Sequence, residues 1–188
     1  MEELLAYIYS LMAFTEKSWQ ALQPALAEVE FAKGDDLLKA GKVCNALFFI
    51  VRGSCRAFYN EDGQEVNTSF FFEGEIATNI SSFGSGQPSL FSIQACEPVT
   101  AIRFNKVGLR EAARENADIE TLGRKCLQLI AGKQEKFGAI FQRLNPEGRY
   151  DWLQEHYPEI LQRVPQTQLA SFLGVARETV SRIRGRRS

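Results

Sequence analysis

The stretch "LASFLGVARETVSRI", Leu169 to Ile183, decides the fold of the C-terminal part of this chain. Its apolar residues recur at helical spacing on both sides of a glycine, which predicts two short helices separated by a break. Gly174 suits the left-handed turn that ends a helix, and it follows the small Ala170 by four residues, so the stretch predicts a helix-turn-helix. The residues predicted to face inward are Leu169, Phe172, Leu173, Val175, Val180 and Ile183.

The polar residues of the second helix predict a DNA-contacting face. The N-terminal residues of such a helix enter the major groove, where arginine bonds to guanine and glutamate accepts from cytosine. A glutamate there also favours the helix dipole, so a solvated basic surface helix remains the alternative. The residues expected to contact DNA are Gln168, Arg177, Glu178, Thr179, Ser181, Arg182 and Arg184.

Positive charge is concentrated at the C-terminus. The whole chain has 22 Lys and Arg against 23 Asp and Glu, a net charge of −1. Residues 163–188 contain six arginines and one glutamate, hence +5, which leaves −6 for the remainder. This asymmetry predicts contact with a polyanion, although the final "RGRRS" alone would also be explained as a solvated tail.

Length and composition describe an ordinary globular protein: 188 residues, 45% of them hydrophobic. No run of about 18 uncharged apolar residues occurs, so no membrane span is expected. The N-terminal "MEELLAYIYSLMAF" (residues 1–14) is acidic and has no small-residue cleavage site, so it does not read as a signal peptide. We therefore expect a cytoplasmic protein without a membrane partner.

The cysteine and histidine content argues against cofactors and catalysis. Cys44, Cys55, Cys96 and Cys126 form no CxxC pair, and His156 is the single histidine. Zinc sites, iron–sulfur clusters and haem need closer or more numerous ligands, so no metal and no cofactor are expected. Metal-dependent chemistry in a strand-rich barrel needs several histidines, and the chain is therefore not expected to be an enzyme.

The N-terminal two thirds predict a helix followed by an antiparallel sandwich or barrel. Residues from Leu4 to Met12 have helical spacing, and from about Val29 to Phe104 short aromatic and β-branched segments alternate with glycine-bearing turns. Asp62-Gly63 is a hairpin signal. The segments expected as strands are "NALFFIVRG", "SCRAFY", "VNTSFFF", "FSIQA" and "VTAIRF".

A long helix is expected next. Apolar residues step by three or four from Ile119 to Leu144, which predicts a helix of about 27 residues, about 40 Å long, ending near Asn145-Pro146. Its continuous seam favours a homodimer, with packing wholly on its own barrel as the alternative. "EGRYDWLQEHY" predicts a further helix, broken at Pro158, and Pro165 introduces the last two. The expected domains are 1–117, 118–145 and 146–188.

This arrangement resembles the Crp/Fnr transcription regulators over nearly the whole chain. The resemblance implies an α+β fold: an antiparallel β jelly-roll of the cyclic-nucleotide-binding type, a long dimerisation helix and a C-terminal helix-turn-helix domain. "GVARETVSRI" is similar to the family's recognition helix, in which Arg177, Glu178 and Arg182 occupy the base-reading positions. The implied protein is a bacterial homodimer that reads a palindrome of TGTGA-like half-sites in double-stranded DNA. RNA polymerase is a candidate partner.

The effector region departs from the family. "FEGE", Phe72 to Glu75, is similar to the entrance of the family's nucleotide pocket, so Gly74 and Glu75 are candidate ligand residues. Ser89 and Leu90 stand where cyclic-nucleotide binders have an arginine–serine pair, and a serine hydroxyl cannot replace the bidentate arginine–phosphate contact. We therefore expect an unknown small-molecule effector other than cyclic AMP. The alternative function is a cyclic-nucleotide or small-ligand module that regulates a protein partner.

Overall fold

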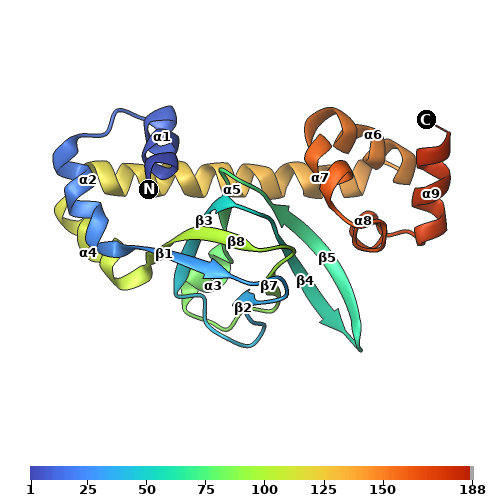
Figure 1. The fold of residues 1–188 in the computed structure, drawn as a ribbon, viewed down its shortest axis with the longest axis horizontal. Helices are drawn as coiled ribbons and strands as arrows, with labels where there is room; N and C mark the ends of the chain where they lie inside the picture. The colour runs from blue at the N-terminus through green and yellow to red at the C-terminus, as the bar shows by residue number, and fades with distance from the viewer. Residues whose placement is uncertain (187–188) are drawn as a thin grey trace. The chain divides into compact units, whose positions relative to one another are not determined.

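The computed structural model describes residues 1–186, which form α-helices and β-strands (Figure 1). The strands are β1 (Leu26–Phe31), β2 (Asp36–Leu38), β3 (Ala46–Arg52), β4 (Cys55–Glu61), β5 (Gln64–Phe71), β6 (Ile76–Ala77), β7 (Ser92–Ala95) and β8 (Val99–Asn105). The helices are α1 (Glu2–Leu11), α2 (Glu16–Leu22), the 3-10 turn η1 (Gln23–Ala25), α3 (Ile80–Ser85), α4 (Lys106–Glu115), α5 (Ala117–Arg143), α6 (Pro146–His156), α7 (Pro158–Arg163), α8 (Gln166–Leu173) and α9 (Arg177–Gly185).

The strands of residues 1–186 form two four-stranded sheets, ordered β1-β8-β3-β6 and β2-β7-β4-β5. The strand β8 lies between β1 and β3 and pairs antiparallel with both, for example Leu26 with Phe104 and Phe49 with Ile102. Apolar side chains from both sheets form a core between them. The antiparallel sandwich or barrel predicted from the alternating segments is confirmed, and so is the jelly-roll fold that the resemblance implies.

The β4–β5 hairpin forms at the expected turn. Asp62 has φ 51° and Gly63 has φ 85°, the positive pair that a two-residue type I′ turn requires. The side-chain oxygen of Asn60 accepts a hydrogen bond from the Gly63 N–H at 3.0 Å and closes the turn. The Asp-Gly pair therefore predicted this element correctly.

Some elements were not predicted from the sequence. The strand β1 starts at Leu26, three residues before the expected change at Val29, and α2 and α4 were not expected as helices. The helix α4 has few large apolar residues because it packs closely: a Cβ on Gly108 would lie 3.2 Å from the Cα of Ala25. Its small contact surface gives a weak periodic signal.

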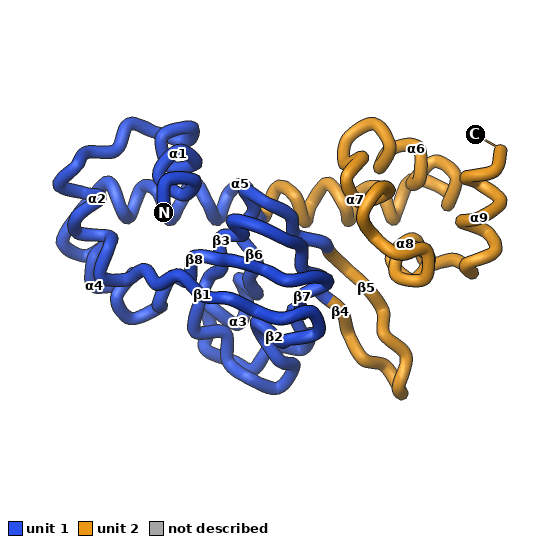
Figure 2. The backbone as a smooth tube through the Cα atoms, in the orientation of Figure 1, with its two compact units in different colours: residues 1–57, 70–130 blue, residues 58–69, 131–188 orange. Residues whose placement is uncertain are grey.

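The chain divides into two compact units (Figure 2). Unit 1 comprises residues 1–57 and 70–130, and unit 2 comprises residues 58–69 and 131–188. The division falls inside α5 and assigns the tip of the β4–β5 hairpin to unit 2 with the C-terminal helices. In unit 2, Phe137 lies 5.8 Å from Trp152 and 5.6 Å from Phe172 between ring centroids, forming an aromatic core.

The long helix α5 has the expected 27 residues, but most of its apolar seam is covered by its own chain. Ile119 and Leu122 are buried in unit 1, and Phe137 and Ile140 are buried in unit 2. These four residues pack within their own chain, and the homodimer through this helix stays a prediction. The large apolar side chains that stay exposed along this region are Leu127, Leu129 and Leu144.

Candidate nucleic-acid interface

The turn between α8 and α9 is built by Gly174. Its φ of 70° is left-handed, a conformation that costs most other residues free energy. The Gly174 N–H bonds to the carbonyl of Ser171 at 3.2 Å, and the Val175 N–H bonds to the carbonyl of Ala170 at 3.0 Å. This pair of hydrogen bonds is a Schellman motif, which stops α8 and redirects the chain into α9.

The apolar faces of the two helices are buried as expected. Leu169 and Leu173 of α8 are at most 1% exposed, and so are Val180 and Ile183 of α9. Val175, in the turn, is half-buried. Because α9 is anchored along this face, its opposite face is fixed in orientation toward solvent.

The solvent face of α9 carries charged groups. Arg177, Glu178, Ser181 and Arg182 are all exposed. Among the described residues neither Arg177 nor Glu178 has a recorded side-chain partner, whereas Arg182 donates a 3.4 Å hydrogen bond to the hydroxyl of Thr179. Hydrogen-bonding groups at the start of α9 are thus available to a ligand.

The start of α9 lacks a side-chain cap. Ala176 occupies the N-cap position and makes no side-chain bond to the helix. Glu178, in the first turn, places a carboxylate near the positive end of the helix dipole and offsets part of the missing cap. A polyanion approaching this end would meet the same unsatisfied N–H groups.

Two of the residues expected to contact DNA are half-buried. Arg184 donates to the carbonyl of Leu161 in α7, so it holds α9 against its neighbour. The Oε1 atom of Gln168 is the one buried side-chain oxygen or nitrogen in the described chain without a hydrogen-bond partner. Arg184 therefore contributes to the scaffold under the exposed face, and the contact of Gln168 with DNA stays a prediction.

Of the two terminal arginines, the structure describes Arg186 and not Arg187. Arg186 pairs with Glu147 at 2.9 Å, and both side chains are exposed. Such an exposed pair contributes little stability and exchanges readily with a phosphate. Arg187, in the basic "RGRRS" segment expected to meet a polyanion, lies outside the described residues.

Arg149 of α6 was not identified from the sequence. Its guanidinium donates to three carbonyls: Leu144 at 2.9 Å, Phe141 at 2.9 Å and Leu173 at 2.8 Å. It therefore ties the C-terminal ends of α5 and α8 together and fixes the position of the helix-turn-helix. Sequence spacing carries no signal for this role, because the three acceptors are backbone groups from separate helices.

The "FEGE" loop closes on itself. Gly74 has φ 80°, and the Glu75 carboxylate accepts a hydrogen bond from the Phe72 N–H at 3.0 Å. The backbone of the loop is held by Ile50 of β3, whose N–H bonds to the Glu75 carbonyl at 2.9 Å. Glu75 thus caps the turn of its own loop, and its role as a ligand residue stays a prediction.

Ser89 and Leu90 are arranged unlike a phosphate anchor. The Ser89 hydroxyl donates to the carbonyl of Phe91 at 2.6 Å and accepts from the side-chain amide of Asn79 at 2.8 Å and the Phe91 N–H at 3.3 Å. These bonds use all the capacity of a hydroxyl. Leu90 is 79% exposed and offers no polar group.

Residues 1–186 show neither a membrane-spanning helix nor a metal-binding cluster. Within them no helix is both long and apolar enough to cross a bilayer. Nor do three or more His, Cys, Asp or Glu side chains in that range gather in a group suited to a metal ion.

Comparisons with known proteins agree with this architecture. Residues 28–116 match the model of the cyclic nucleotide-binding domain family. FixK2 from Bradyrhizobium japonicum is 17% identical with a TM-score of 0.68, over 86% of this chain and 83% of FixK2. The catabolite activator protein of Thermus thermophilus is 17% identical with a TM-score of 0.59, over 94% of this chain and 84% of that one.

A third similar structure is the c-di-GMP-responsive global regulator CLP of Xanthomonas campestris. It is 16% identical with a TM-score of 0.63, over 90% of this chain and 89% of CLP. No curated protein sequence matches this chain. At these sequence identities the comparisons show the fold. They therefore confirm that the fold of this chain resembles that of Crp/Fnr regulators.

Proposed function

We propose that this chain is a sequence-specific DNA-binding transcription regulator of the Crp/Fnr type. The observation that carries the proposal is the solvent face of α9, where Arg177, Glu178 and Arg182 stand exposed on a helix anchored by Val180 and Ile183. An arginine beside a glutamate matches the donor and acceptor pattern of a G·C-containing half-site. The comparisons support the fold in which such a helix is presented.

The proposed regulator acts as a homodimer on a palindromic site. Two recognition helices about 34 Å apart would enter successive major grooves on one side of the duplex. We place the subunit contact on α5, where Leu127 is 44% and Leu129 is 51% exposed. Exposed apolar side chains on a long helix gain free energy by association.

Selection from random double-stranded DNA tests the proposal directly. The full chain, incubated with a randomised 30-base-pair pool at moderate salt, is expected to enrich a palindrome with half-sites similar to TGTGA. Sedimentation of the protein alone and with the enriched duplex would show a dimer in both. Failure to enrich any motif, with a folded protein, would overturn the proposal.

The effector is a separate part of the proposal. The Ser89 and Leu90 geometry supports a regulator that does not respond to cyclic AMP, because the side chains at the phosphate position carry no free donor and no positive charge. Activation by another small molecule, or constitutive binding, would then set its activity. Recruitment of RNA polymerase is a further step that a transcription assay on the enriched site would measure.

A further inference from the structure

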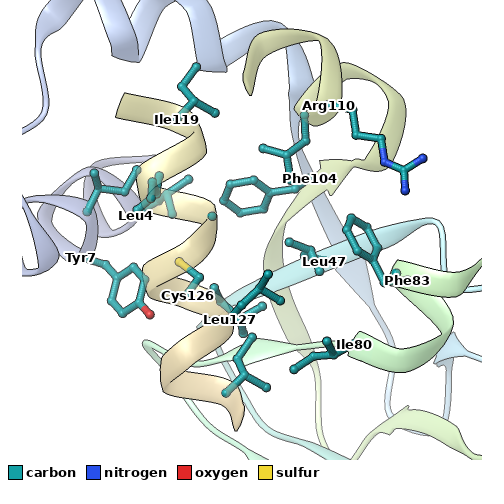
Figure 3. Close-up of a pocket in the computed structure, with 17 residues that line it drawn as sticks. Leu4, Tyr7, Leu47, Ile80, Phe83, Phe104, Arg110, Ile119, Cys126 and Leu127 are labelled. Carbon is teal, nitrogen blue, oxygen red and sulfur yellow. The ribbon is translucent and has the colours of Figure 1, made fainter. Parts of the chain in front are cut away.

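Unit 1 contains an apolar cavity whose lining includes Ile76, directly after the "FEGE" loop. Its volume is about 260 Å³, and its walls come from α1, α3, α4, the first half of α5 and the strands β3, β6 and β8 (Figure 3). None of Gly74, Glu75, Ser89 and Leu90 lines it. Lining side chains that define its walls are Leu4, Ile76, Phe83, Phe104, Leu122 and Ile130.

The size of the cavity sets the size of an occupant. A 150 Å³ cavity in a protein core binds benzene, so by proportion this one accommodates about ten carbon atoms. A void of this size left empty would cost the lining side chains their dispersion contacts. An apolar molecule of that length would restore them.

The wall formed by α1 and α5 carries no charge near neutral pH. Tyr7 and Cys126 contact each other there, and burial raises the pKa of Tyr7 to about 12 and that of Cys126 to about 11. Both groups therefore stay protonated, and this wall suits an apolar chain.

The opposite edge of the cavity is cationic. Figure 3 shows Arg110 and Phe83 on the far side of the lining residues from Tyr7. The Nζ atom of Lys106 lies 5.1 Å from the centre of the Phe83 ring, and Lys106 is only 9% exposed. Among the described residues no carboxylate pairs with Lys106 or Arg110 in a salt bridge. Arg110 lines the cavity, whereas Lys106 stands outside its lining, next to the ring of Phe83.

The spacing on α4 strengthens this edge. Lys106, Arg110 and Arg114 follow one another at intervals of four residues, so they share one face of the helix. Like charges at this spacing repel and destabilise a helix. An anion held at the mouth of the cavity would offset that repulsion.

We propose that this cavity binds an amphipathic anion, with an apolar body of about ten carbon atoms inside it and the anionic head at Arg110. A medium-chain carboxylate is the simplest molecule of this class. The inference extends the proposed function by naming a chemical class of effector, yet binding to the cavity is measurable without DNA. Its failure would leave the DNA-reading proposal untouched.

Calorimetric titration of the full chain with decanoate, decan-1-ol and decylammonium tests the match of charge. We expect saturable one-to-one binding of decanoate, weaker binding of the alcohol and the weakest binding of the cation. Arg110 is exposed, and the Arg110→Gln variant is expected to bind decanoate about fivefold more weakly. Its affinity for the alcohol should be unchanged. Equal affinity for all three ligands, or no binding of decanoate, would overturn the proposal.

A cavity-filling variant tests the location. Gly123 lines the cavity, and a Cβ built on it meets nothing within 4 Å, so Gly123→Leu fills the space without a backbone clash. It should also stabilise α5, because leucine is a better helix former than glycine. We expect at least a tenfold loss of decanoate affinity.

Gly138→Leu, on the exposed part of the same helix, is the matched control and should bind decanoate like the original chain. Unchanged binding by Gly123→Leu would overturn the assignment. The assignment would also be overturned if the wild-type protein bound no decanoate and Gly123→Leu disrupted the dimer. The cavity would then belong to a subunit contact.

Discussion

Ser171 of α8 and Asn67 of β5, 104 positions apart in the sequence, are joined by a 3.0 Å hydrogen bond from the Asn67 N–H to the Ser171 hydroxyl. The same hydroxyl donates to the carbonyl of Glu65 at 2.8 Å. The tip of the β4–β5 hairpin is thus attached to the first helix of the helix-turn-helix within unit 2. The Ser171 hydroxyl therefore joins the hairpin segment of unit 2 to α8.

Loss of that hydroxyl is expected to loosen unit 2. Ser171→Ala removes two hydrogen bonds to the hairpin, and we expect the free energy of unfolding to fall by about 1–2 kcal/mol. Ser181→Ala, on the exposed face of α9, is the control and should change stability by less than about 0.5 kcal/mol. Urea denaturation measures both, and equal stabilities of the two variants would contradict the structural role of Ser171.

Gly174 should tolerate no side chain without a cost. Gly174→Ala retains a φ of 70° only at an expense of about 1–2 kcal/mol, although a Cβ there has ordinary space, 3.7 Å from the guanidinium of Arg149. Gly138→Ala, in the exposed middle of α5, should have the opposite sign and stabilise by up to about 1 kcal/mol. Thermal unfolding of the two variants makes the comparison. A neutral Gly174→Ala would mean that the turn relaxes out of the left-handed region.

Alkaline pH should destabilise the fold through buried thiols. Burial raises the pKa of Cys55 to about 12 and that of Cys126 to about 11, against about 8.5 in an unfolded chain. Below pH 8.5 both states are protonated and the thiols have no effect. As pH rises from there toward 11, the unfolded state releases protons first, so stability falls by about 1.4 kcal/mol per pH unit and thiol.

The double variant Cys55→Ala/Cys126→Ala isolates this contribution. Lysines and most tyrosines titrate alike in both proteins, so the difference between the two pH profiles reports the two thiols together with Tyr7, whose pKa Cys126 also raises. Denaturant midpoints at pH 8 and pH 10.5 are sufficient, and we expect a flatter profile for the variant. Parallel profiles would show that these thiols are more accessible than the structure indicates.

Cyclic AMP and cyclic GMP should not bind with useful affinity. The Ser89 hydroxyl is fully used by Asn79 and Phe91, and the Glu75 carboxylate is bonded to its own loop. A cyclic phosphate would therefore be desolvated without a compensating charge. Calorimetry with either nucleotide should detect no saturable heat, and micromolar binding would show that this region rearranges around a ligand.

The sequence predicted those parts of the fold whose signals are local. The Asp62-Gly63 turn, the 27-residue helix and the Gly174 break each depend on residues close together in the chain. The strand β1 was placed late because its residues are half-buried at best, so its alternation is weak. Contacts of side chains with distant backbone groups, such as those of Arg149, leave no pattern at all.

The candidate site also has a part that the sequence predicted and a part that it did not. Helical spacing placed Arg177, Glu178 and Arg182 on one exposed face, but it could not reveal that Arg184 turns back to Leu161. The cavity in unit 1 was missed because its walls come from elements more than one hundred residues apart.

The comparison of Glu178→Ala with Arg186→Ala decides whether α9 reads bases. A carboxylate that accepts from a cytosine amino group distinguishes one base pair, so its loss should cost about 1–3 kcal/mol on the preferred site and almost nothing on scrambled DNA. Arg186 is exposed and paired with Glu147, an interaction weak enough to exchange with a phosphate. Its loss should weaken binding to both DNAs equally and reduce the salt slope by about one counterion.

Fluorescence anisotropy on the enriched site and on a scrambled duplex, each at two salt concentrations, separates these outcomes. Glu178→Gln is the matched variant, because it keeps the length of the side chain and removes only the charge and one acceptor. It should also lose discrimination at the same base pair. If Glu178→Ala and Arg186→Ala instead lose affinity in parallel on both duplexes, α9 contributes only positive charge, and a basic surface helix accounts for everything seen in residues 177–186.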